Sequence, residues 1–210
     1  MLSGVIFDLD GTLGDTLPVC FAAFRTVFEE YLGESPADAE IRAMFGPTEE
    51  GILRARIPDG SGVLDRYLEA YADAHSLAPK PFAGVEPLLS DLEARAVPVA
   101  VVTGKGPHSA MLSLVHWGLD TRFPIVKAGG DDGNIKDRNM AEVVAEWRVF
   151  AADVVSVGDA PSDVTAAHTV GIVSVAAAWA STAHVGELSA AQPDHLFGGV
   201  SEFAEWLLDR

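Results

Sequence analysis

The stretch MLSGVIFDLDGTLGDT, residues 1–16, contains the strongest signal for the fold. In it, an apolar run ends in two carboxylates. Residues 4–8 predict a fully buried strand, since the run is short, apolar and rich in β-branched and aromatic side chains. Asp8 and Asp10 follow at once, and Gly11 breaks the strand pattern. Two negative charges at the end of a buried strand indicate a site that holds a positively charged or polar group there.

The composition of the chain favours a globular protein and argues against several partners. Its 210 residues are 49% apolar, which suits one domain with an insert. A net charge of −17 repels nucleic acid and anionic membranes, so we expect neither as a partner. No apolar run reaches the ~20 residues of a membrane span, and the start lacks the basic region of a signal peptide. With Cys20 as the single cysteine, we expect a cytoplasmic location.

The pattern of apolar residues changes once along the chain. Residues 15–78 repeat apolar side chains at helical spacing, whereas strands and helices alternate after the stiff linker at 79–84. The later strands are predicted at 97–102, 123–126, 153–157, 171–175 and, more weakly, near 195–196. A helix is predicted at 139–147, before the strand at 153–157. Alternation predicts an α/β fold with a doubly wound, Rossmann-like parallel sheet. We expect residues 1–13 and 84–210 to form this core and residues 14–83 to form an all-helical cap.

Polar residues follow three of the predicted strands. Asp8 and Asp10 follow the first, Thr103 to Lys105 the second, and the segment 158–163 (GDAPSD) a later one. In open α/β sheets the crevice outside the carboxyl ends of the strands is the usual ligand site. Crowded carboxylates without histidine or cysteine favour Mg²⁺, which often shares phosphate oxygens. The sequence therefore predicts a magnesium and phosphate site at this edge of the sheet.

These segments resemble motifs of the haloacid dehalogenase superfamily, specifically its phosphoglycolate-phosphatase-like members with a helical cap. FDLDGTLGDT is similar to the first motif, DxDGT, and VVTGK at 101–105 to the second, an apolar strand that ends in Thr or Ser. GDAPSD is similar to the fourth motif, GDxxxD. The third is a lysine roughly two dozen residues upstream of that aspartate. Lys136 stands at this distance, but Asp137 follows it where the family usually has proline.

The resemblance implies a Mg²⁺-dependent phosphatase that acts on a small organic phosphate monoester, such as phosphoglycolate or a sugar phosphate. Asp8 would attack phosphorus to form an aspartyl-phosphate, and Asp10 would act as general acid and base. Thr103 and Lys136 would hold the phosphoryl oxygens during catalysis. Metal binding is expected of Asp8, Asp10 (through its carbonyl), Asp159 and Asp163, and substrate binding of Gly11, Thr12, Gly46, Thr103, Gly104 and Lys136. The expected partner is a small phosphorylated metabolite.

Several alternatives stay open from the sequence. Lys105 competes with Lys136 as the phosphate-binding lysine, and Thr103 is alternatively a helix cap. Arg54 and Arg56 in the cap either bind a substrate carboxylate or lie on the surface. A sugar phosphomutase similar to β-phosphoglucomutase would use the same aspartate pair, and a non-catalytic phosphate-binding regulatory module would keep the fold alone. The physiological substrate and the oligomeric state are not readable from one sequence.

Overall fold

The computed structural model describes residues 2–58 and 60–210. Within these residues, six strands form one parallel sheet in the order β3-β2-β1-β4-β5-β6. They are β1 (Gly4–Phe7), β2 (Val99–Val102), β3 (Ile125–Lys127), β4 (Val154–Gly158), β5 (Val173–Ala177) and β6 (His195–Phe197). The predicted α/β class with a doubly wound parallel sheet and a helical insert is confirmed.

Strand β1 lies in the middle of the sheet and is buried along its whole length. Its last residue, Phe7, pairs with Val101 of β2 on one side and with Val157 of β4 on the other. Because all three strands run parallel and end at the same level, the residues that follow them emerge side by side. This topology brings the three polar segments of the sequence to one edge.

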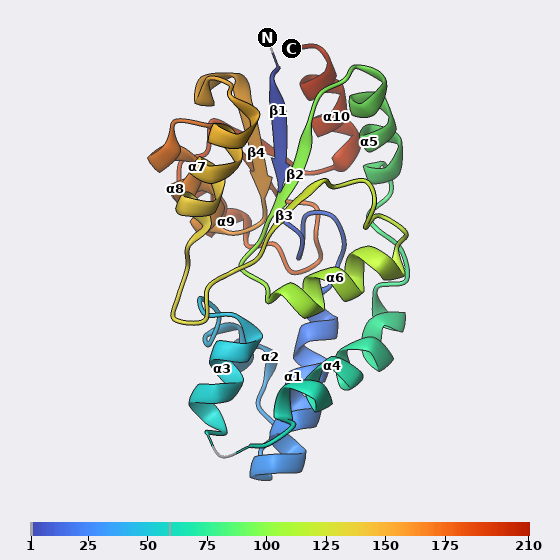
Figure 1. The fold of residues 1–210 in the computed structure, drawn as a ribbon, viewed down its shortest axis with the longest axis vertical. Helices are drawn as coiled ribbons and strands as arrows, with labels where there is room; N and C mark the ends of the chain where they lie inside the picture. The colour runs from blue at the N-terminus through green and yellow to red at the C-terminus, as the bar shows by residue number, and fades with distance from the viewer. Residues whose placement is uncertain (1, 59) are drawn as a thin grey trace.

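Helices cover both faces of the sheet, as the apolar character of β1 requires. On one face Phe7 packs edge-to-face against Phe203, with ring centroids 6.5 Å apart. On the other face Ile6 shares a buried cluster with Met140. The covering helices are α5 (Val85–Ala94) and α10 (Val200–Leu208) on the first face, and α7 (Lys136–Trp147) and α8 (Pro161–Val170) on the second (Figure 1). A short helix, α9 (Val185–Ala190), and the 3-10 turn η2 (Ala151–Asp153) complete the core.

The insert between β1 and α5 is helical and lies beyond the carboxyl ends of the strands, with α6 (Pro107–His116) between it and the sheet (Figure 1). It contains α1 (Leu17–Leu32), α2 (Asp38–Arg42), α3 (Glu49–Arg56), α4 (Val63–Ala74) and the 3-10 turn η1 (His75–Leu77). Phe24 of α1 packs on Tyr67 of α4, with ring centroids 4.7 Å apart. In the described residues, none of the helices has both the length and the apolar character that crossing a membrane requires.

Helix α3 joins the insert to the core. The Thr48 hydroxyl caps this helix and donates a hydrogen bond to the Asp131 carboxylate, in the loop between β3 and α7. The Thr48 amide donates to the Gly130 carbonyl at 3.1 Å, and Arg54 pairs with Asp131 at 3.1 Å. A Cβ atom at Gly51 would lie 2.1 Å from the Asp131 carbonyl oxygen, so only glycine permits this approach. The insert therefore rests directly on the core.

The structure differs from the predicted boundaries for local reasons. Helix α7 begins at Lys136 rather than at residue 139, because the Asn134 side chain accepts a hydrogen bond from the Lys136 amide at 2.9 Å. Strand β5 begins at Val173 rather than at 171, since Gly171 ends α8 in the left-handed region (φ 81°). The other predicted strands are displaced by one or two residues at their ends. Helix α9 was not predicted, because in its six residues only Leu188 is buried. The division at 13/14 and 83/84 stays a prediction.

The two buried tyrosines of α4 give a matched test of this packing. Tyr67 buries a hydroxyl with no hydrogen-bond partner among the described residues, whereas the Tyr71 hydroxyl lies 2.7 Å from Ser113 Oγ. We expect Tyr67→Phe to keep or raise the free energy of unfolding, and Tyr71→Phe to lower it by about 1 kcal/mol. Urea unfolding of both variants checks this, and the reverse order would contradict the described packing.

Candidate active site

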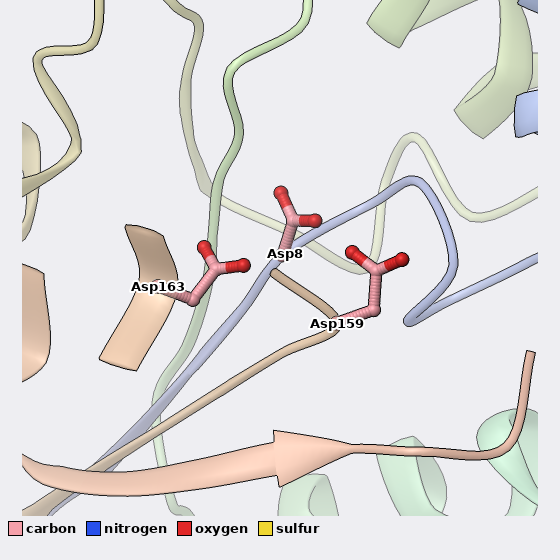
Figure 2. A group of neighbouring side chains, drawn as sticks. All are labelled: Asp8, Asp159 and Asp163. Carbon is pink, nitrogen blue, oxygen red and sulfur yellow. The ribbon is translucent and has the colours of Figure 1, made fainter. Parts of the chain in front are cut away.

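Three carboxylates meet where β1 and β4 end. Asp8 follows β1, Asp159 follows β4, and Asp163 stands in the first turn of α8. One oxygen atom of each lies within 4.8 Å of the others. Figure 2 shows the Asp8 side chain between those of Asp163 and Asp159. The sheet topology therefore brings together residues that are more than 150 positions apart in the sequence.

Lys136 is the cation of this cluster. Its buried ammonium group lies 3.1 Å from Asp8 Oδ1 and also donates to Asp163 Oδ1. Burial alone lowers the pKa of Lys136, but the adjacent Asp163 and Asp8 carboxylates raise it above its ordinary value, so the lysine stays charged. Three carboxylates and one ammonium leave a formal charge of −2.

The pKa values of the carboxylates reflect this unbalanced charge. Burial raises the pKa of Asp8 to about 6, although the Lys136 charge acts in the opposite direction. Burial, followed by the charges of Asp8 and Asp163, raises the pKa of Asp159 well above its ordinary value. The ionised forms are therefore costly in this pocket, and a divalent cation would stabilise them. The donor set consists of oxygen atoms alone, so the triad fits a metal ion of the Mg²⁺ type.

Asp10 lies apart from the triad, on the side of the insert. Its Oδ1 accepts a short hydrogen bond from the Thr16 hydroxyl and lies 3.5 Å from the Lys105 ammonium. Burial raises the pKa of Asp10, and Lys105 opposes this rise. The two aspartates that stand two positions apart in the sequence thus have different lysine partners.

A cavity of about 330 Å³ connects the strand ends with the insert. Asp8, Asp10, Gly104, Lys105, Lys136 and Asp159 form its core side, together with Asn134, residues 160–162, His184 and Glu187. The insert contributes Leu17, Cys20, Phe24, Arg42, Phe45, Gly46, Pro47, Glu49 and Ile52. Charged groups therefore gather at the strand ends, and the opposite wall is largely apolar. A volume near 300 Å³ suits a small molecule.

Three residues predicted to bind substrate do not line the cavity. Gly11, Thr12 and Thr103 are not among the described residues that line it. The Thr103 hydroxyl is buried and accepts a hydrogen bond from the Lys105 amide at 3.2 Å. Gly11 has φ 73°, and a Cβ atom there would lie 2.1 Å from Asp159 Oδ2. Gly11 thus makes room for the Asp159 carboxylate.

The insert contributes residues that the sequence analysis did not single out for the site. Phe24, Cys20 and Glu49 line the cavity, whereas Arg54 and Arg56 are outside its lining. Arg54 pairs with Asp131, as described above, and Arg56 with Glu34. Apolar residues at helical spacing indicate a core equally well, so no local signal separates Phe24 and Cys20 from ordinary packing residues.

Comparison with known proteins finds relatives along most of the chain. The chain is 31% identical over 179 residues to tyrosine-protein kinase PtkA of Mycobacterium tuberculosis, which covers 83% of this chain and 62% of the kinase. It is 30% identical over 188 residues to a phosphoglycolate phosphatase of Xylella fastidiosa, covering 86% and 82%. The crystal structure of CbbY from Rhodobacter sphaeroides in complex with phosphate superposes with a TM-score of 0.80 at 17% identity, and all of both chains is covered.

The chain spans less than two thirds of the length of the mycobacterial kinases that it matches, but most of the phosphatase. Residues 5–177 match the family model of the haloacid dehalogenase-like hydrolases, so the match includes β1 from its second residue, the insert and all the carboxylates of the triad. The protein therefore belongs to the haloacid dehalogenase-like hydrolase family.

Proposed function

We propose that the protein is a Mg²⁺-dependent phosphatase that hydrolyses a small phosphate monoester through an aspartyl-phosphate on Asp8. One observation carries the proposal: the Asp8 carboxylate lines a small cavity, beside a buried lysine and two further carboxylates. The relative from Xylella fastidiosa is named a phosphoglycolate phosphatase, which supports this reaction class.

The first chemical step uses Asp8 and Asp10. A carboxylate oxygen of Asp8 forms a bond to phosphorus while the bond to the ester oxygen breaks, and Asp10 gives its proton to the departing oxygen. Lys136, 3.1 Å from Asp8 Oδ1, offsets negative charge as the phosphoryl group arrives. The alcohol leaves, and the phosphoryl group stays on Asp8.

The second step returns the enzyme to its starting state. Asp10, now ionised, takes a proton from water as the water oxygen attacks phosphorus, and the bond between Asp8 and phosphorus breaks. Inorganic phosphate forms, and the proton on Asp10 is available for the next turnover. Both steps take place in the same small cavity. The apolar wall that the insert contributes limits the access of bulk water to this cavity and so favours the reaction.

Mg²⁺ fits the acidic residues beside this cavity. The Asp8, Asp159 and Asp163 carboxylates and the backbone carbonyl of Asp10 would hold it. When bound, the ion neutralises the phosphoryl oxygens and keeps Asp8 ionised. The formal charge of −2 in the buried cluster and the raised pKa values of Asp8 and Asp159 support this assignment.

A phosphotransferase is the second candidate function, because the mycobacterial relatives are named tyrosine-protein kinases. A mutase would likewise pass the phosphoryl group of Asp8 to a second hydroxyl rather than to water. Release of inorganic phosphate in the absence of any other acceptor favours the phosphatase. Transfer of the label from a phosphate donor to an added sugar phosphate or tyrosine peptide would favour the alternative.

Replacement of the nucleophile tests the proposed chemistry directly. We expect Asp8→Asn to lower kcat for p-nitrophenyl phosphate by about 10⁴-fold or more, because the amide cannot form the covalent intermediate. The readout is phosphate release with Mg²⁺ present. Asp91→Asn, at an exposed position of α5, is the control and should keep full activity. Equal turnover by Asp8→Asn and the unmodified protein would overturn the mechanism.

Metal binding has a readout that does not depend on turnover. At a Mg²⁺ concentration 100-fold above the dissociation constant, the protein should gain about 2.7 kcal/mol of stability relative to protein in chelator. Asp159→Asn removes one ligand and one repelled charge. It should therefore stabilise the metal-free protein and abolish most of the gain from Mg²⁺. Thermal unfolding with and without Mg²⁺ measures both effects, and a full Mg²⁺ gain in this variant would exclude Asp159 as a ligand.

A further inference from the structure

A second buried lysine lies on the core side of the cavity, where the core meets the insert. Lys105 follows β2, and its side chain has no exposed surface. Its ammonium group lies 2.9 Å from Glu49 Oε1, 3.5 Å from Asp10 Oδ1 and 3.0 Å from Cys20 Sγ, and it stands 4.3 Å from the centre of the Tyr71 ring. Burial of a lysine is costly unless it is paired, so these contacts hold the group in one place.

The partner of Lys105 in the insert, Glu49, binds the core at three points. Besides Lys105, its carboxylate accepts a short hydrogen bond from the Gly106 amide, and one from the Ser109 hydroxyl at 2.6 Å. Burial raises the pKa of Glu49, but Lys105 and these two hydrogen-bond donors lower it by more. The pKa of Glu49 therefore lies below its ordinary value, and the carboxylate is ionised. All three partners belong to the core: Lys105 and Gly106 precede α6, and Ser109 lies in its first turn. The contacts therefore exist only while α3 rests on the core.

Lys105 also determines the position of Asp10. The Thr16 hydroxyl and the Lys105 ammonium both act on Oδ1 of Asp10. In the part of the chain that the structure describes, no hydrogen bond or ion pair reaches Oδ2, and Asp10 lines the cavity. One carboxylate oxygen is thus fixed, and the other is left for a ligand.

We propose that Lys105 is a positioning residue: through Glu49 it makes the orientation of Asp10 towards the leaving oxygen depend on contact between α3 and the core. This inference rests on the proposed phosphatase function. It gives the two buried lysines separate tasks, because Lys136 lies against Asp8 and Lys105 lies against Asp10. The chain has a net charge of −17 and four lysines, so each buried lysine serves a different aspartate of the pair.

The choice of leaving group separates this role from a merely structural one. Nitrophenolate is a stable anion at neutral pH and departs without a proton, whereas the alkoxide of benzyl alcohol needs one. p-Nitrophenyl phosphate and benzyl phosphate share an aromatic ring of similar size, so both probe the same cavity. In the step that releases the alcohol, a residue that acts through Asp10 therefore affects the benzyl ester far more.

The central experiment compares Lys105→Met with the unmodified enzyme on both esters. We expect kcat/KM for benzyl phosphate to fall about 100-fold or more, and kcat/KM for p-nitrophenyl phosphate to fall less than about 10-fold, because kcat/KM reports the step in which the leaving group departs, whereas hydrolysis of the aspartyl-phosphate is common to both esters. Asp10→Asn should give the same selective loss, whereas Lys136→Met should lower turnover of both esters. Equal losses on the two esters in Lys105→Met would overturn the inference.

The role of the insert has its own variants. Glu49→Gln should show a smaller loss that is again selective for benzyl phosphate, and Glu86→Gln, at an exposed position of α5, should leave both rates unchanged. The double variant Lys105→Met/Glu49→Gln removes both charges of the buried pair and should fold even where the single lysine variant does not. A non-selective loss in Glu49→Gln or in the double variant would contradict the coupling.

The outcomes also separate this inference from the proposed function. If the unmodified enzyme releases phosphate from neither ester with Mg²⁺ present, the phosphatase proposal fails and the inference fails with it. If it hydrolyses both esters and the lysine variant loses both equally, only the positioning role of Lys105 is wrong.

Discussion

The central place of β1 between β2 and β4 is the constraint on which the rest of the structure depends. Phe7 pairs with Val101 and Val157, and parallel pairing makes the three strands end at the same level. Asp8 therefore emerges beside the segments that contain Lys105 and Asp159. The apolar burial of β1 on both faces stabilises the site, because it fixes the one strand that supplies both aspartates.

Electrostatics then divides the site into two parts. Lys136 neutralises charge from the end of β1 and the start of α8, and Lys105 does so between the end of β1 and α3. Each buried lysine thus links segments that are distant in the sequence. The first part has a formal charge of −2 and suits a cation, whereas Asp10, Glu49 and Lys105 of the second part leave a formal charge of −1. A chain with four lysines places two of them here.

Much of the fold was predictable because its signals are local. The apolar run before Asp8, the GDAPSD turn and the change of periodicity near residue 79 are each visible in a few residues. The contact between Lys105 and Glu49 was not predictable in this way, because Glu49 is equally typical of the first turn of an ordinary helix. Its meaning depends on where α3 lies in space. Helix α9 has too little buried surface to leave a pattern, and the start of α7 depends on one side-chain cap.

The loop between β3 and α7 links the insert to the carboxylate cluster. The loop lies beside α3 (Figure 1) and contacts it through Gly130 and Asp131. It ends at Lys136, whose ammonium group lies 3.1 Å from Asp8 Oδ1. Only a few residues separate Asp131, which contacts α3, from Lys136, which contacts Asp8. A displacement of α3 is therefore expected to move this loop and the lysine at its end. Substitutions that alter the stiffness of this loop would therefore change how a movement of α3 affects the contact between Lys136 and Asp8.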